Sequence, residues 1–142
     1  MADLVIVDTN VLRAGNTGTY RAVTFGEAIS AGQGVYQSST DQKYYLTDAN
    51  DSAAPANTGQ AAIAVSTAST DQQGVIARGN AIVQLGAGVM TPGTVYVISS
   101  ANAGGIAPSV DLAIGAELTI VGYAQTDELL NLTFDATGIT KA

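Results

Sequence analysis

The chain has 142 residues, of which 46% are apolar and only 12% charged, whereas about 25% of the residues of an ordinary soluble domain are charged. Twelve acidic residues outnumber five basic ones, which gives a formal charge of -7, and the sequence contains no Cys, His or Trp. This composition excludes disulfides, Cys- or His-ligated zinc, haem and iron–sulfur sites, and catalysis by Ser-His-Asp or Cys-His arrangements. The length indicates one domain, or at most two very small ones.

The charge balance also argues against nucleic acids and membranes as partners. The five basic residues are scattered singly along the chain, whereas binding to phosphate or to an anionic membrane surface needs clustered Lys and Arg. No apolar run approaches the ~18 residues of a membrane span, and Met1-Ala2-Asp3-Leu4 lacks the basic region of a secretory signal. We therefore expect synthesis in the cytosol and neither a nucleic acid nor a membrane as partner.

Short runs of alternating or β-branched residues, separated by turn residues, follow one another along the chain. Residues 3–12 are an apolar series that fits an extended arm or a first strand. The further predicted strands are 20–25, 33–37, 43–47, 61–66, 74–78, 80–85, 95–99, 104–108, 117–124 and 129–134. Thr91-Pro92-Gly93-Thr94 predicts a type II turn, because Pro fixes φ at the second position and Gly adopts the positive φ of the third.

Helix is scarce in this pattern. Residues 50–57 fit at most one short helical turn, because Pro55 limits its length. Roughly nine to eleven short strands predict an all-β fold, either a compact β-barrel or a β-sandwich. We expect an N-terminal arm or first strand over residues 1–18 and a single all-β domain over 19–142.

One short repeat is visible. Ser39-Thr40-Asp41-Gln42 recurs as Ser69-Thr70-Asp71-Gln72, each time between predicted strands. A duplicated loop that contacts a partner is one interpretation. The favoured one is that Ser, Thr and Asp are good turn residues and recur by chance.

Candidate chemical sites are few. Asp48, Asn50 and Asp51 would offer oxygen ligands to calcium, but no bidentate acid follows downstream, so we favour an ordinary turn. Carboxylates such as Asp111 and the Asp127-Glu128 pair show no spacing that selects a glycosidase couple, and the Gly-rich stretches lack the Lys of a phosphate loop. We expect no metal, no cofactor and no catalytic residue.

Two adjacent tyrosines, Tyr44 and Tyr45, fall on a predicted strand. Neighbouring strand residues point to opposite faces, so one ring is expected to enter the core and the other to stay outside. We favour an interface or ordinary surface for the outer ring over a sugar-binding platform.

Several turn-and-strand segments resemble the C-terminal half of small capsid decoration (cement) proteins of tailed bacteriophages. They are Thr91-Pro92-Gly93-Thr94-Val95-Tyr96-Val97, Ala103-Gly104-Gly105-Ile106-Ala107-Pro108, Val110-Asp111-Leu112 and Val121-Gly122-Tyr123-Ala124. The upstream order is similar, so that the resemblance covers residues 20–135. It implies a head-stabilising structural protein without enzymatic activity, commonly a homotrimer, on the outer surface of the virion. There it would sit at three-fold positions of an icosahedral capsid and clamp neighbouring major capsid protein subunits against internal DNA pressure.

The N-terminal segment is the predicted contact surface. Its apolar residues precede Gly15-Asn16-Thr17-Gly18, which we interpret as a hinge, and have no obvious place in the later hairpin pattern. The residues expected to contact the capsid or a neighbouring subunit are Leu4, Val5, Ile6, Val7, Val11 and Leu12. Exposed strand edges offer a second way to pair with capsid or sister subunits.

Two other functions remain as alternatives. A receptor-binding or tail-fibre-type β module that recognises a host surface glycan would share this composition and a trimeric state. Fibres usually carry longer repeats or a collar linker, and this sequence has neither. A carboxylate-dependent glycan hydrolase is less favoured still, because no acidic pair stands out. The net negative charge is interpreted as solubility of an exposed coat component.

Overall fold

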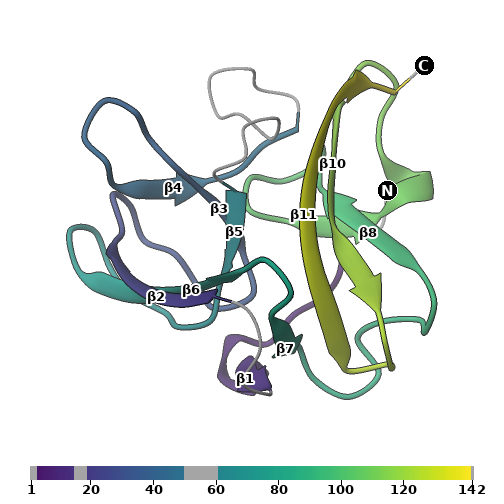
Figure 1. Cartoon of the computed structure of the whole chain (residues 1–142), viewed down its shortest axis with the longest axis horizontal. Helices are drawn as coiled ribbons and strands as arrows, with labels where there is room; N and C mark the ends of the chain where they lie inside the picture. The colour runs from purple at the N-terminus through teal and green to yellow at the C-terminus, as the bar shows by residue number, and fades with distance from the viewer. Residues whose placement is uncertain (1–2, 15–18, 50–60, 142) are drawn as a thin grey trace.

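The computed structural model describes residues 3–14, 19–49 and 61–141, apart from the side chains of residues 136, 138 and 140 (Figure 1). This part of the chain forms eleven strands in two antiparallel sheets, joined by loops and by two single-turn 3-10 helices, η1 (Asp8–Asn10) and η2 (Ser109–Asp111). The all-β prediction is confirmed. Of the two architectures left open, the paired sheets correspond to a compact β-sandwich.

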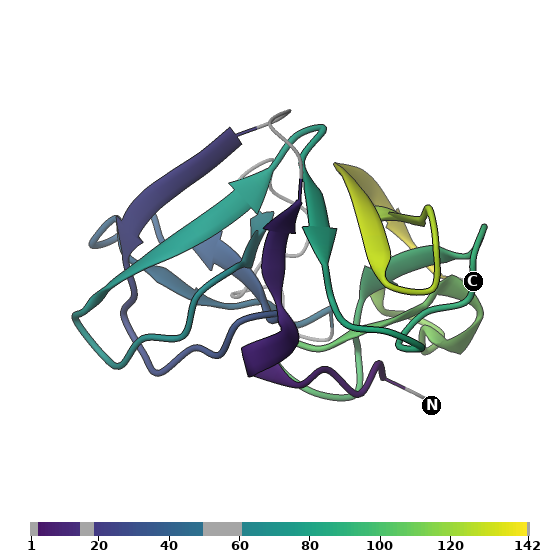
Figure 2. The ribbon, with the colours of Figure 1, turned by 90° about the horizontal axis from the view of Figure 1, so that it is seen from below.

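Two sheets of unequal size stand side by side (Figures 1 and 2). The six-stranded sheet has the order β1 (Leu12–Ala14), β7 (Ile82–Gln84), β11 (Leu129–Thr140), β10 (Glu117–Ala124), β8 (Val95–Ile98) and β9 (Ile106–Pro108). The five-stranded sheet has the order β2 (Thr19–Thr24), β6 (Gln73–Arg78), β5 (Ala61–Ala64), β3 (Gly34–Gln37) and β4 (Tyr44–Leu46). The chain therefore crosses between the sheets twice, from β1 to β2 and from β6 to β7.

Period-two patterns located most of these strands. The predicted turn at 91–94 is present, with the Thr94 N–H donating to the Thr91 carbonyl at 3.2 Å and a φ of +81° at Gly93. The last strand, β11, runs on to Thr140, well past the predicted end at residue 134. Of the apolar series over 3–12, interpreted as an extended arm or a first strand, only Leu12 belongs to a strand, β1, which pairs with β7.

The two short helical turns lie where none was expected. η1 closes when the Val11 N–H donates to the Asp8 carbonyl at 3.2 Å, and η2 follows β9 directly. The helical turn predicted over 50–57 falls on residues that lie outside the described part of the chain. So does the boundary near residue 18, at the connection between β1 and β2.

The fold contains two hydrophobic cores. The inter-sheet core joins both sheets and includes Ile63, Ala77, Val83, Leu85, Val97, Ile98, Leu130 and Leu132. The curl core lies within the five-stranded sheet, which bends round on itself, and includes Phe25, Ile29, Val35, Tyr44, Ala62, Ala64 and Ile76. A parallel bridge between Phe25 and Tyr44 draws the ends of the curl together, and the Gly26 N–H donates to the Tyr44 carbonyl at 2.8 Å. Both faces of this sheet are therefore buried over part of its area.

Candidate functional site

The predicted contact surface begins with an extended segment, Asp3–Val7, here called the strap (Figure 2). The Leu4 N–H donates to the Ile106 carbonyl at 2.8 Å, which places the strap beside β9 at the edge of the six-stranded sheet. The Asp3 carboxylate accepts hydrogen bonds from the Ser99 hydroxyl at 2.6 Å and from the Asn102 side-chain amide at 3.0 Å. One backbone bond and one carboxylate thus hold the start of the strap.

The inward side of this N-terminal region belongs to the inter-sheet core. Leu4 and Ile6 are half-buried and pack against that core, and Val11 is buried within it with 5% of its surface exposed. Gly32 makes room for the strap, because its φ is +95° and a Cβ there would lie 2.6 Å from Ile6 Cγ2. Both the backbone conformation and the close approach require glycine at this position.

The outward side of the same region presents aliphatic side chains to the surroundings. Val5 is 84% exposed, Val7 52% and Leu12 53%. The alternation from Leu4 to Val7 is that of a strand with one face covered. Three of the six predicted contact residues, Leu4, Ile6 and Val11, therefore pack in or against the chain's own core. The other three, Val5, Val7 and Leu12, are exposed and can contact another molecule.

A hollow lies on each side of the strap. The larger one, about 540 Å³ and here called the strap groove, is bounded by the exposed Val5 and Val7 together with Val89, Tyr96 and Pro108. The smaller one, about 340 Å³, lies between the strap and residues 30–33 and 102–106. The exposed Val5 and Val7 thus form part of the lining of a concave surface.

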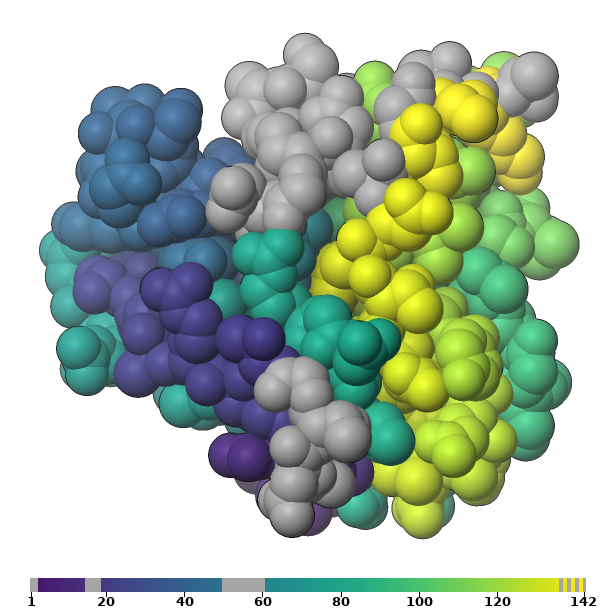
Figure 3. All heavy atoms as spheres, viewed as in Figure 1, coloured from purple at the N-terminus to yellow at the C-terminus, as the bar shows by residue number. Residues whose placement is uncertain are grey.

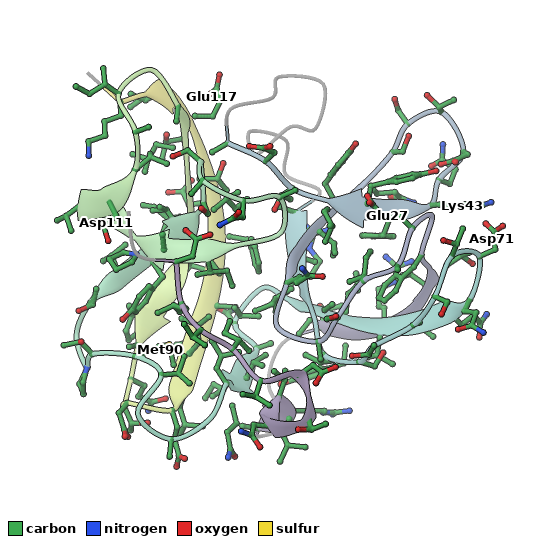
Figure 4. The ribbon with its side chains drawn as sticks, turned by 180° about the vertical axis from the view of Figure 1, so that it is seen from behind. Glu27, Lys43, Asp71, Met90, Asp111 and Glu117 are labelled. Carbon is green, nitrogen blue, oxygen red and sulfur yellow. The ribbon has the colours of Figure 1, made fainter. Side chains whose placement is uncertain are left out.

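A second feature links the two copies of the short repeat. Lys43 Nζ lies 2.6 Å from Asp71 Oδ1, so the loop before β4 meets the loop before β6 (Figure 4). The two copies adopt different turns, since the left-handed residue is Gln42 in the first and Asp71 in the second. These two loops, here called the paired loops, contact each other but have different conformations.

The charges of these loops are engaged within the chain. The Tyr45 hydroxyl donates to Asp41 Oδ2 at 2.6 Å; this bond holds the pKa of Asp41 below its usual value and raises the pKa of Tyr45. The hydrogen bond to Asp71 raises the pKa of Lys43.

The two neighbouring tyrosines point to opposite faces, as predicted. Tyr44 is buried in the curl core, whereas Tyr45 is half-buried, with its ring centroid 6.3 Å from that of Tyr36.

The described residues contain neither a cluster of metal ligands nor a helix that could span a membrane. Of the suggested calcium ligands only Asp48 is described, and within residues 3–14, 19–49 and 61–141 no three His, Cys, Asp or Glu residues are grouped closely enough to hold a metal ion. No helix in the same part of the chain is long and apolar enough to cross a membrane.

Sequence reasoning missed one group of exposed aliphatic side chains, here called the aliphatic end. Val110 is 79% exposed, Ile114 81% and Ile139 60%. Lys141 ties their segments together, because its Nζ donates to the Val110 carbonyl at 3.1 Å and its carbonyl accepts from the Gly115 N–H at 2.7 Å. Val110 and Ile114 fall between predicted strands, so no periodic pattern marked them; a branched aliphatic residue in a connecting segment was the only signal.

The strap and the aliphatic end offer apolar surface, and the paired loops offer charges that already interact with each other. Compared with known proteins, the chain matches no protein-family model and no curated protein sequence.

Proposed function

We propose that this chain is a non-enzymatic capsid decoration protein of a tailed bacteriophage. It binds the outer surface of an icosahedral capsid as a trimer at three-fold positions and stabilises the shell by bridging major capsid protein subunits. The proposal begins from the resemblance of residues 20–135 to such proteins.

The structural observation that supports it is the strap with its outward valines. Val5 and Val7 are exposed beside a groove of about 540 Å³, and the backbone next to them is extended. An extended segment presents backbone groups to a neighbouring strand as well as side chains to a hollow, which is how strand addition binds a partner. We assign the capsid contact to Val5, Val7 and Leu12, while Leu4, Ile6 and Val11 keep the segment seated.

The composition suits the same role. An acidic chain without thiols stays soluble and does not cross-link at the high copy number that a capsid coat needs. Its net charge of -7 also disfavours adhesion to DNA.

The test adds purified protein to undecorated capsids and images them by electron microscopy. The wild-type chain is expected to give ordered density at the three-fold positions and to raise the temperature at which the capsids open. The double variant Val5→Asp/Val7→Asp should bind at least about tenfold more weakly, because it places two charges in an apolar contact. Ala28→Asp/Thr70→Asp adds the same charge at exposed positions away from the strap and should bind like wild type.

Three outcomes contradict the proposal in different ways. Capsids without ordered density after saturation with the wild-type chain remove the capsid role. Density that persists with Val5→Asp/Val7→Asp keeps the capsid role but removes the strap from the contact. Saturable binding to host cells, lost when surface glycans are stripped and accompanied by bare capsids, supports the receptor-binding alternative.

A further inference from the structure

The strap groove and the smaller hollow beside it have a charged side chain in common. Asp3 lines both, and the other described residues that line the two hollows are apolar or neutral. None of the chain's five basic residues lines either hollow. A partner that enters the strap groove therefore meets a carboxylate and no cation along the described lining.

Neutral donors hold this carboxylate in place. The Ser99 hydroxyl donates to Asp3 Oδ1 at 2.6 Å, and the Asn102 side-chain amide donates to Oδ2 at 3.0 Å. Ser99 is fully buried, and its Oγ accepts the Ala101 N–H at 2.9 Å, so the hydroxyl proton is left for Asp3. The two donors orient both carboxylate oxygens without compensating the charge, and each oxygen keeps a lone pair for a further donor.

Asp127 adds negative charge beside the same groove. Its Oδ2 accepts the N–H of Gly88, which lines the strap groove, at 3.0 Å, and its side chain is exposed. Two carboxylates thus border a groove whose lining is otherwise neutral. Charges of one sign around a cleft reinforce each other, and here they attract a cation.

Contact with the exposed valines also brings a partner over Asp3. Val5, Val7 and Asp3 line one groove, so a segment that covers the two valines removes water from the carboxylate as well. A carboxylate that loses its water and gains no cation is strongly unfavourable. Because the chain supplies no basic side chain to the groove, the compensating cation has to come from the partner.

We propose that the strap groove binds an apolar segment of the major capsid protein that carries a Lys or Arg, and that Asp3 receives this cation. The inference rests on the proposed function and defines the chemistry of its partner. Aliphatic side chains of the segment pack against Val5 and Val7, while the cationic group donates to the remaining lone pairs of the Asp3 carboxylate. A segment with Asp or Glu at the same place is repelled.

Asp3→Asn tests the charge because it removes the charge and keeps the shape. An amide at this position still accepts from the Ser99 hydroxyl, and its NH₂ group donates to Asn102 once the Asn102 amide turns over. Amide hydrogen exchange at Leu4 should therefore stay as in wild type, which shows that the strap remains seated.

Asp135→Asn is the matched control. It removes the same charge from an exposed residue of β11 that lines neither hollow. Figure 3 shows the surface of β11 in yellow, whereas the strap crosses the opposite face of the molecule (Figures 2 and 4).

Two short peptides test the cation without capsids. One is Val-Lys-Val with blocked termini, and the other is the same peptide with its lysine side chain acetylated, which removes the charge. In titrations followed by amide NMR, Val-Lys-Val should shift the strap signals and bind at least about threefold more tightly than the acetylated peptide. This preference should vanish in Asp3→Asn and persist in Asp135→Asn.

Undecorated capsids test the same charge in the assembled contact. Wild-type binding should weaken as the NaCl concentration rises from about 50 mM to about 500 mM, because salt screens the ion pair. Asp3→Asn should bind at least about threefold more weakly than wild type at the lower concentration, and the difference should shrink at the higher one. Asp135→Asn should follow wild type at both.

The inference is overturned if Asp3→Asn binds capsids like wild type at both salt concentrations, or if the two peptides bind equally. Binding that is weaker by the same factor at every salt concentration, with faster exchange at Leu4, also overturns it, because Asp3 then only holds the strap. A wild-type chain that prefers Val-Lys-Val but leaves capsids bare removes the proposed function and keeps the cation site. Ordered density on capsids without a preference between the peptides keeps the proposed function and removes the cation site.

Discussion

The two sheets bury their apolar residues in different ways. The six-stranded sheet uses the strap and the neighbouring sheet as covers, so its core contains side chains from both ends of the described chain. The five-stranded sheet covers part of itself by curling, and its smaller core is made of residues 25–76. A composition rich in small and β-branched residues thus allows one molecule to bury apolar residues in two ways, between two sheets and within one curled sheet. The stacked region carries the proposed capsid contact, and the curled region carries the two loops joined by Lys43 and Asp71.

Truncating one large residue in each core is the strongest way to test how far the two regions are independent. Phe25→Ala empties the curl core and Leu130→Ala the inter-sheet core; both side chains are fully buried. We expect losses of about 3–5 kcal/mol and about 2–5 kcal/mol in the free energy of unfolding, measured by urea titration followed by tyrosine fluorescence and circular dichroism. A single transition in both variants indicates one cooperative unit. Two separated transitions would show that the curl unfolds by itself.

The seat of the strap is the next feature to break. Gly32→Ala combines a positive φ with a Cβ 2.6 Å from Ile6 Cγ2, so we expect a loss of about 2–3 kcal/mol. Gly79→Ala is the matched control, because its φ is +50° but nothing lies within 4 Å of the added Cβ, and it should cost about 1 kcal/mol. Equal losses for the two variants would mean that the strap does not press on Gly32.

The two hydrogen bonds that the Asp3 carboxylate accepts, here called the latch, are expected to stabilise the strap without affecting the rest of the fold. Asp3→Ala removes the acceptor of the Ser99 hydroxyl and of the Asn102 amide, which should cost about 1–2 kcal/mol of the strap's attachment. Amide hydrogen exchange at Leu4 should then speed up about tenfold, while exchange in β10 stays unchanged. Unaltered exchange at Leu4 would show that the backbone bond to Ile106 holds the strap without help.

The smallest effect belongs to the paired loops of the curled region, and it appears as a pH dependence. The pKa of Asp41 lies below its usual 3.8 because the Tyr45 hydroxyl donates to the carboxylate, so its stabilising effect is present above that pH and is lost as pH falls through the lowered pKa. Tyr45→Phe should raise the Asp41 pKa in a carboxyl-carbon NMR titration. An unmoved titration curve would show that the Lys43 contacts alone set that pKa.

Most strands were predictable because their signal is local. Period-two alternation and turn residues such as Pro92 and Gly93 act within a few positions, and the structure has strands in the predicted places from Thr19 onward. The sites were less predictable because they depend on distant partners. Nothing near Ile6 shows that Gly32 will seat it, and nothing near Val11 shows that it becomes core while Val5 stays outside. The same holds for the bridge between Phe25 and Tyr44.

The latch between Asp3 and Ser99 joins residues 96 positions apart. During synthesis the strap must therefore wait for most of the chain before its partners exist. At a synthesis rate of about 5–20 residues per second, the apolar side chains of the strap stay uncovered for several seconds on the ribosome. Asp3 and Asp8 flank it with like charges, a placement typical of residues that hinder aggregation of apolar segments. The segment that we assign to capsid binding is thus also the one whose docking comes late in folding.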